Sequence, residues 1–165
     1  QRQMCIRDRY KTGCKMEENI DLRPNLSQDE LVRISPLTLA YLGDTVYESY
    51  IREYLIKKNV FLKINNLHKM AIIYVRAKSQ ARAIKSIEGI LQEDELSVFK
   101  RARNHKKNTS AKNASMIDYK HSTGFEAVVG YLYLKGDKDR LDHIISLSIG
   151  VIESDQNQSN RNKEK

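Results

Sequence analysis

Residues 39–50 read LAYLGDTVYESY, and this stretch decides the fold class. Apolar and small residues recur three and four positions apart through it, which is the period of an amphipathic α-helix. Asp44 stands on the same stripe as Ala40, Tyr41 and Tyr47, which we expect in a core. A buried carboxylate destabilises a protein unless a positive group meets it. The rest of the chain should therefore supply a partner for Asp44.

Composition indicates one globular domain. The chain has 165 residues, 40% hydrophobic and 30% charged, which is enough for a real core. No apolar run approaches the roughly 20 residues needed to span a bilayer, and no signal peptide is visible, so we expect a cytoplasmic protein without membrane contact. The net charge of +8 suits a polyanion, nucleic acid more than an acidic membrane.

The two ends of the chain lack any helical or strand period. Residues 1–15 contain both cysteines and are interpreted as a doubtful, disordered extension, with Met16 as the more plausible start. Two cysteines so close together do not predict a disulfide framework. The polar residues 154–165 are predicted to be a disordered tail. The folded domain is therefore expected over residues 16–153.

Between these ends the patterns predict helices only. Ser27 and Glu30 form a capping box that begins a short helix over 27–34. Pro36 then occupies the first turn of a long helix that ends near Lys58. The fold class is therefore all-α, a helical bundle. Further helices are expected over 65–90 (with a break in its crowded middle as an alternative), 92–106, 124–135 and 138–152, with a loop over 108–123.

A second acid, Glu126, lies in STGFEAVVGYLYL (122–134), again among small and apolar residues. Gly43 and Gly130 carry no side chain, so the two helices could approach closely and bring Asp44 and Glu126 together. Adjacent carboxylates repel unless a cation lies between them, and Mg²⁺, or alternatively Mn²⁺, is the natural bridge. The alternative is that each acid pairs with an arginine or faces solvent, and the residues alone favour that alternative.

The motifs LAYLGDTVYE (39–48) and YKHSTGFEAVVGYLYL (119–134) together resemble the Mini-III ribonucleases. These are a compact branch of the ribonuclease III family without a separate domain for binding double-stranded RNA. The likeness covers about residues 27–152. It implies a ribonuclease III-like endonuclease domain that acts as a homodimer on double-stranded RNA with Mg²⁺. By motif match, Asp44 is the catalytic aspartate and Glu126 the metal-binding glutamate, so the partner of Asp44 would be a metal ion.

The sequence departs from the wider family at two acidic positions. Larger members carry a glutamate four residues before the aspartate and an aspartate three before the glutamate, where this chain has Ala40 and Thr123. The Mini-III branch also has fewer acids than the larger members. The number of metal ions in the site is therefore left open. Glu48, one turn after Asp44, is a candidate outer-shell ligand, with an exposed helix acid as the alternative.

Basic residues gather in two places. Segment 100–121 carries seven Lys and Arg against one acid, just before Glu126, and Lys78, Arg82 and Lys85 form a stripe on one helix. We expect these residues to contact RNA phosphates, and the alternative for the segment is a solvated loop. The predicted RNA-binding residues are Lys78, Arg82, Lys85, Arg101, Arg103, Lys106, Lys107, Lys112 and Lys120.

Other ring residues are interpreted as structural. His105 and His121 are single and lack ligand spacing, so they are expected to be polar loop residues. Tyr74, Tyr131 and Tyr133 are expected in the core or in a dimer seam, because duplex RNA offers few unstacked bases for them to bind.

The expected function is Mg²⁺-dependent endonucleolytic cleavage of double-stranded RNA. By resemblance the substrate is precursor large-subunit (23S) ribosomal RNA, with a ribosomal protein as a candidate helper. The leading alternative is a non-catalytic RNA-binding or ribosome-associated module on the same fold, although such a module has no use for carboxylates that face phosphate. A helix-turn-helix DNA binder is the third reading, and it would need a short exposed recognition helix that the sequence does not show.

Overall fold

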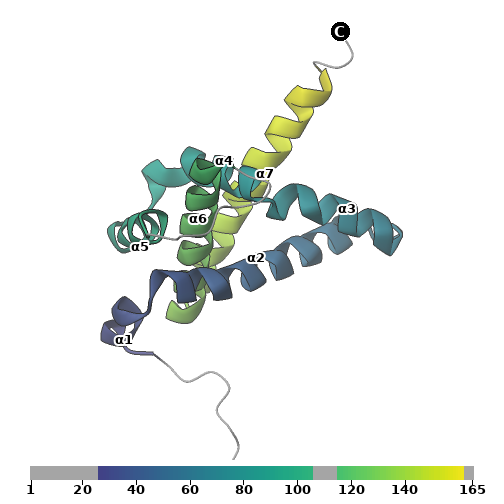
Figure 1. Ribbon diagram of the computed structural model, residues 1–165. Helices are drawn as coiled ribbons and strands as arrows, with labels where there is room; N and C mark the ends of the chain where they lie inside the picture. Colours follow the sequence, from purple (N-terminus) through teal and green to yellow (C-terminus); the bar gives the residue numbers. More distant parts are fainter. Residues whose placement is uncertain (1–25, 106–114, 162–165) are drawn as a thin grey trace, which may run out of the picture.

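The computed structural model describes residues 26–105 and 115–161 (Figure 1). Every regular element in these two ranges is helical, which confirms the all-α prediction. The expectations for residues 1–15 and for a start at Met16 lie outside the described residues. The helices are α1 (Gln28–Arg33), α2 (Pro36–Lys58), α3 (Ile64–Val75), α4 (Ala77–Ile87), the short 3-10 helix η2 (Glu88–Ile90), α5 (Glu93–Arg103), α6 (Met116–Lys135) and α7 (Lys138–Arg161).

The first two helices begin where their capping residues predict. The Ser27 hydroxyl accepts the backbone N–H of Glu30 at 3.3 Å, and the Glu30 carboxylate accepts the backbone N–H of Ser27 at 2.8 Å. This reciprocal pair satisfies two donors that the helix leaves unpaired. Pro36 stands in the first turn of α2, and α2 ends at Lys58 as expected.

The predicted helix over 65–90 is divided near its middle. Arg76 has extended backbone angles (φ −64°, ψ 143°), and it ends α3 and begins α4. The alternative of a break is therefore confirmed. The Arg76 guanidinium donates from Nε to the Ser79 hydroxyl at 3.0 Å, which fixes the side chain beside the first turn of α4.

The predicted loop over 108–123 is wrong from residue 116 onward, because α6 begins at Met116. Ser115 caps this helix through its hydroxyl, which accepts a backbone N–H at 3.0 Å. The polar residues of the first turns are accommodated within the helix. The Ser122 hydroxyl, for example, donates to the backbone carbonyl of Tyr119 at 2.9 Å. A polar composition was therefore a poor guide to loop structure here.

The predicted disordered tail over 154–165 is also wrong as far as Arg161, where α7 ends; residues 162–165 lie outside the described ranges. The reason is visible at Glu153, whose carboxylate receives three hydrogen bonds from α2 and α3 and so anchors this part of α7. The donors are Tyr54 (2.7 Å), Lys58 (2.6 Å) and Tyr74 (3.0 Å).

Helix α6 lies at the centre of the fold and packs against α2, α4, α5 and α7 (Figure 1). Its Phe125 ring meets the Tyr47 ring of α2 edge to face, with centroids 4.9 Å apart, and both rings are fully buried. Tyr74 and Tyr131 are buried as predicted, and Tyr133 is partly exposed. The polar residues of α6 therefore lie among four neighbouring helices.

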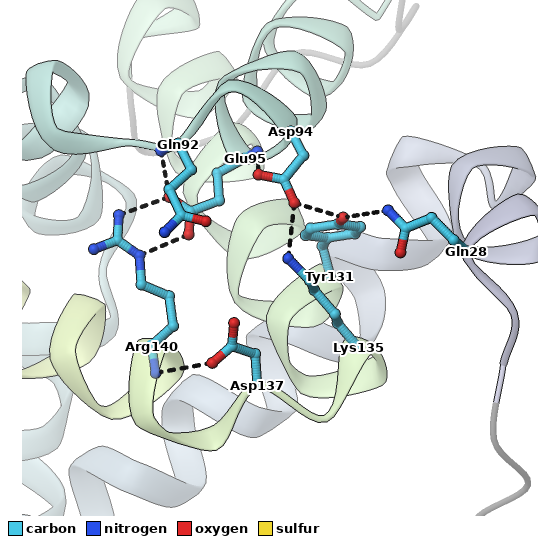
Figure 2. Close-up of polar contacts among 8 residues, drawn as sticks. All are labelled: Gln28, Gln92, Asp94, Glu95, Tyr131, Lys135, Asp137 and Arg140. Atoms are coloured by element: carbon cyan, nitrogen blue, oxygen red, sulfur yellow. Dashed lines mark hydrogen bonds and ion pairs between the residues drawn. The ribbon is translucent and has the colours of Figure 1, made fainter.

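A polar cluster fixes the C-terminal half of α6 (Figure 2). The fully buried Glu95 of α5 accepts two hydrogen bonds from the Arg140 guanidinium of α7, at 2.7 and 2.8 Å. Its neighbour Asp94 accepts from the Tyr131 hydroxyl at 2.8 Å and from the Lys135 ammonium at 2.9 Å, both on α6. The beginning of α5 therefore holds the end of α6 and the start of α7 in fixed positions.

Candidate active site

Helices α2 and α6 cross with their backbones in contact. A Cβ placed on Gly43 would lie 1.8 Å from the Glu126 carbonyl oxygen, and one placed on Gly130 would lie 2.1 Å from the Leu39 carbonyl oxygen. Only glycine fits at either position, so the close approach predicted from small residues is confirmed. Asp44 follows Gly43 directly and Glu126 precedes Gly130 by one turn, so both acids stand at the same crossing.

Asp44 is exposed at the edge of this crossing and is not a core residue, contrary to the expectation from the stripe. Tyr41 is likewise 82% exposed, whereas Ala40 and Tyr47 are buried as expected. The difference arises because α6 approaches α2 so closely at Gly43 that it covers only a narrow stripe of that helix. Asp44 is therefore accessible to a metal ion and to substrate.

The electrostatic setting of Asp44 favours a cation. Partial removal of water by neighbouring atoms and the negative charge of Glu48 raise the pKa of Asp44 above its ordinary value. Glu48 itself is half-buried and forms an ion pair with Arg52, one turn further along α2. No ion pair to Asp44 is found within the described residues. A positive ion at Asp44 would relieve both effects that raise its pKa.

The carboxylates at the crossing suit a hard divalent ion, but they are fewer than the ligands that such an ion needs. In the described ranges, no group of three or more His, Cys, Asp or Glu residues is close enough to hold a metal. Ala40 and Thr123, where larger family members carry acids, are buried, and the Thr123 hydroxyl donates to the Tyr119 carbonyl at 3.0 Å. Asp44 and Glu126 are the acids on the two helices of the crossing, and carboxylate oxygens are donors that a hard divalent ion prefers.

The three cations predicted on α4 are exposed, but two of them have acidic partners on other helices. Arg82 contacts Asp155 of α7 at 3.0 Å, and Lys85 contacts Asp118 of α6 at 3.3 Å. The stripe has no acid in its own helix, so sequence spacing could not reveal these pairs. Lys78 is in no ion pair found among the described residues.

The cations predicted around α5 and α6 divide into different environments. Arg101 donates from its guanidinium to the Val32 carbonyl at 2.9 Å and so ties α5 to the end of α1. The Arg103 guanidinium lies over the Phe99 ring, 5.1 Å from its centroid. Lys120 is exposed and lines a small hollow on α6, almost two turns before Glu126. Lys106, Lys107 and Lys112 lie outside the described residues.

Two further placements differ from the sequence reading. His121 belongs to α6 and not to a loop, and its ring lies 6.0 Å from that of Phe99. Arg76 is an exposed cation that charge patterning missed, because it directly follows the apolar stretch of α3 and lies outside the spacing of Lys78, Arg82 and Lys85. The break in the helical pattern at this position was the sequence signal that could have drawn attention to Arg76.

Residues 37–137 match the model of the ribonuclease III domain, a range that contains both glycines and both acids of the crossing. The chain is 49% identical over 138 residues to the Mini-ribonuclease 3 of Clostridium tetani, covering 83% of this chain and 91% of that protein. It belongs to the Mini-ribonuclease 3 branch of the ribonuclease III family. A second Mini-ribonuclease 3, from Brevibacillus brevis, is 43% identical and covers 84% of this chain and 98% of its own length.

A solved structure supports the same fold for this Mini-ribonuclease 3 chain. A crystal structure of a protein from Fusobacterium nucleatum superimposes with a TM-score of 0.66 at 33% identity, over 72% of this chain and 93% of that one. The resemblance and the ribonuclease III-like fold are therefore confirmed. Membership makes the chain an endoribonuclease of a family that acts on RNA with a divalent metal ion. Across the described residues, no helix has the length and apolar character to cross a membrane.

Proposed function

We propose that this endoribonuclease cleaves double-stranded RNA with Mg²⁺, or alternatively Mn²⁺, held by Asp44 and Glu126. The observation that carries the proposal is the glycine contact between α2 and α6, in which Gly43, the residue before Asp44, meets the backbone carbonyl of Glu126. Precursor 23S ribosomal RNA is the proposed substrate, in the cytoplasm, with a ribosomal protein as a candidate helper; the family resemblance supports these three points.

Each side chain has a defined task in this proposal. The bound ion would lower the pKa of a water molecule and stabilise charge on the scissile phosphate. Asp44 and Glu126 hold the ion from two helices whose spacing is fixed by glycine. Glu48 is oriented by Arg52 and would accept a hydrogen bond from a metal-bound water. Lys120, which lies before Glu126 on α6, is proposed to meet an RNA phosphate beside the site.

The direct test is incubation of purified protein with long duplex RNA and Mg²⁺. We expect cleavage of duplex RNA and no cleavage of duplex DNA or in the presence of EDTA. Binding of RNA without any cleavage would favour the non-catalytic RNA-binding module. Binding of duplex DNA in preference to RNA would favour the helix-turn-helix alternative.

The exposed apolar residues of α2, of α3 and of the turn between them support a homodimer. A single soluble chain rarely leaves so many large apolar side chains in water. We propose that a second copy covers this face, and we expect sedimentation analysis to give twice the mass of one chain. A monomer at micromolar concentration would contradict this. The exposed residues are Tyr41 (82%), Ile56 (55%), Val60 (71%), Phe61 (99%), Ile64 (73%) and Ile72 (48%).

Mg²⁺ and RNA are expected to bind cooperatively. Two carboxylates offer little negative charge, so the ion needs phosphate oxygens to complete its shell. Titration calorimetry should show weak Mg²⁺ binding by the free protein and stronger binding with a non-cleavable duplex, and by linkage Mg²⁺ should tighten RNA binding equally. The double variant Ala40→Glu with Thr123→Asp should bind Mg²⁺ more tightly without RNA. Tight Mg²⁺ binding by the wild-type protein alone would mean that further ligands exist, with Glu48 the first to test.

A further inference from the structure

A cavity of about 370 Å³ lies where the α3–α4 junction meets the last turns of α7. Its polar lining comes from the junction residue Arg76, from α4 and from α7, and no residue of α2 or α6 lines it. It is therefore separate from the crossing that carries Asp44 and Glu126. The polar lining residues are Arg76, Lys78, Ser79, Arg82, Asp155 and Gln156.

The charge of this lining is positive. Three cations face one carboxylate, and that carboxylate, Asp155, contacts Arg82 at 3.0 Å. Arg76 and Lys78 remain as two positive charges without an acid in the lining. All three cations are exposed at the surface, so an anion can reach them from solvent. The Ser79 hydroxyl, on a side chain that is almost fully buried, accepts from Arg76 Nε at 3.0 Å and orients the guanidinium.

An unused donor also lines the cavity. The Gln156 side-chain nitrogen is enclosed and has no hydrogen-bond partner among the described residues. An enclosed donor without a partner is costly, so Gln156 would be stabilised by turning its amide toward an acceptor oxygen in the cavity. The first turn of α4 points the same way, because it contains no acid and its N-cap residue Arg76 makes no side-chain capping bond. Its backbone N–H groups add partial positive charge.

We propose that this cavity binds a phosphate group of the RNA backbone, away from the cleavage site. Guanidinium, ammonium and amide donors around one space are the chemistry that recognises phosphate. The backbone of a long duplex is favoured over a free nucleotide because the cations lie at the surface, where a continuous strand can pass. This inference rests on the proposed function, since it assumes that duplex RNA is the ligand of the protein.

The test compares two double variants of the full chain in binding to duplex RNA without divalent metal, so that no cleavage occurs. Arg76→Gln with Lys78→Gln removes the unmatched charge of the cavity. Lys57→Gln with Lys69→Gln removes the same charge from exposed positions outside it. We expect the cavity variant to bind about tenfold more weakly. The slope of log K against the logarithm of salt concentration should become less steep by about one, the value for one phosphate contact. The control should bind like the wild type.

A third variant should change binding in the opposite direction. Among the described residues Asp155 is the carboxylate of the lining, so Asp155→Asn should make RNA bind more tightly, which a merely structural role for this cluster would not produce. An equal loss in both double variants would overturn the proposal, as would wild-type binding by the cavity variant. Competition by a mononucleotide in the wild type, with RNA binding unchanged in the cavity variant, would assign the cavity to a small phosphate ligand and overturn it too.

Cleavage assays separate this inference from the proposed function. The cavity variant should keep the wild-type kcat at saturating RNA and show a raised KM, because Asp44 and Glu126 are untouched. A wild-type protein that binds duplex RNA but never cleaves it would end the proposed function and leave the cavity result standing. A cavity variant with normal KM and normal salt dependence would end the inference alone.

Discussion

Asp44→Asn is expected to abolish cleavage of duplex RNA while the fold and RNA binding persist. The amide keeps the shape of the side chain but removes the charge that holds the ion. Loss of metal-assisted charge stabilisation should lower kcat by about a thousandfold, equivalent to about 4 kcal/mol in the barrier. Asp44 is exposed, so its neutralisation should not lower the melting temperature. Glu126→Gln should lose activity to a similar degree, because it removes the carboxylate that α6 contributes.

A matched control comes from the same helix. Glu53 is an exposed acid on α2 that pairs with Lys57 and lies two turns beyond Asp44. Glu53→Gln removes one negative charge from α2 without touching the crossing, so it should cleave RNA at the wild-type rate. Near-normal turnover of Asp44→Asn or Glu126→Gln on duplex RNA would remove that residue from the mechanism.

Gly43→Ala is expected to destabilise the protein and to inactivate it together. The new methyl group would fall 1.8 Å from the Glu126 carbonyl oxygen, so α2 and α6 would have to separate. Backbone cannot yield as a flexible side chain can, and we expect a loss of about 3 kcal/mol or more in the free energy of unfolding. The separation would also move Asp44 away from Glu126. Urea unfolding and cleavage assays on the same sample would measure both effects.

Gly150 provides the opposite case within another helix. It lies in α7, and a Cβ placed there would meet nothing within 4 Å. Gly150→Ala should therefore stabilise the protein by up to about 1 kcal/mol through helix propensity alone, with full activity. If Gly43→Ala were as stable as Gly150→Ala, the backbone contact between α2 and α6 would be refuted.

The sequence by itself determined the all-α fold class, the first two helices and the helix crossing. The capping box at Ser27, the proline at the start of α2 and the 3.6-residue period are local signals, and local hydrogen bonds and sterics enforce them. The close approach at Gly43 and Gly130 also followed from sequence, because only residues without bulky side chains allow two backbones to touch. That the side chains of Asp44 and Glu126, which belong to the two helices of this crossing, hold one metal ion stays a prediction.

Only the tertiary structure decided which polar groups are buried or paired. Helical period shows that Asp44 and the apolar residues share a side of α2, but the width of the covered stripe depends on how near α6 comes. Within residues 26–105 and 115–158 the acid that is fully buried is Glu95, matched by Arg140, 45 residues further along the chain. Arg82 meets Asp155 across 73 residues. The same cause explains why the start of α6 and the end of α7 were predicted wrongly. Polar side chains that suggest a loop or a tail become part of a helix once partners elsewhere satisfy their hydrogen bonds.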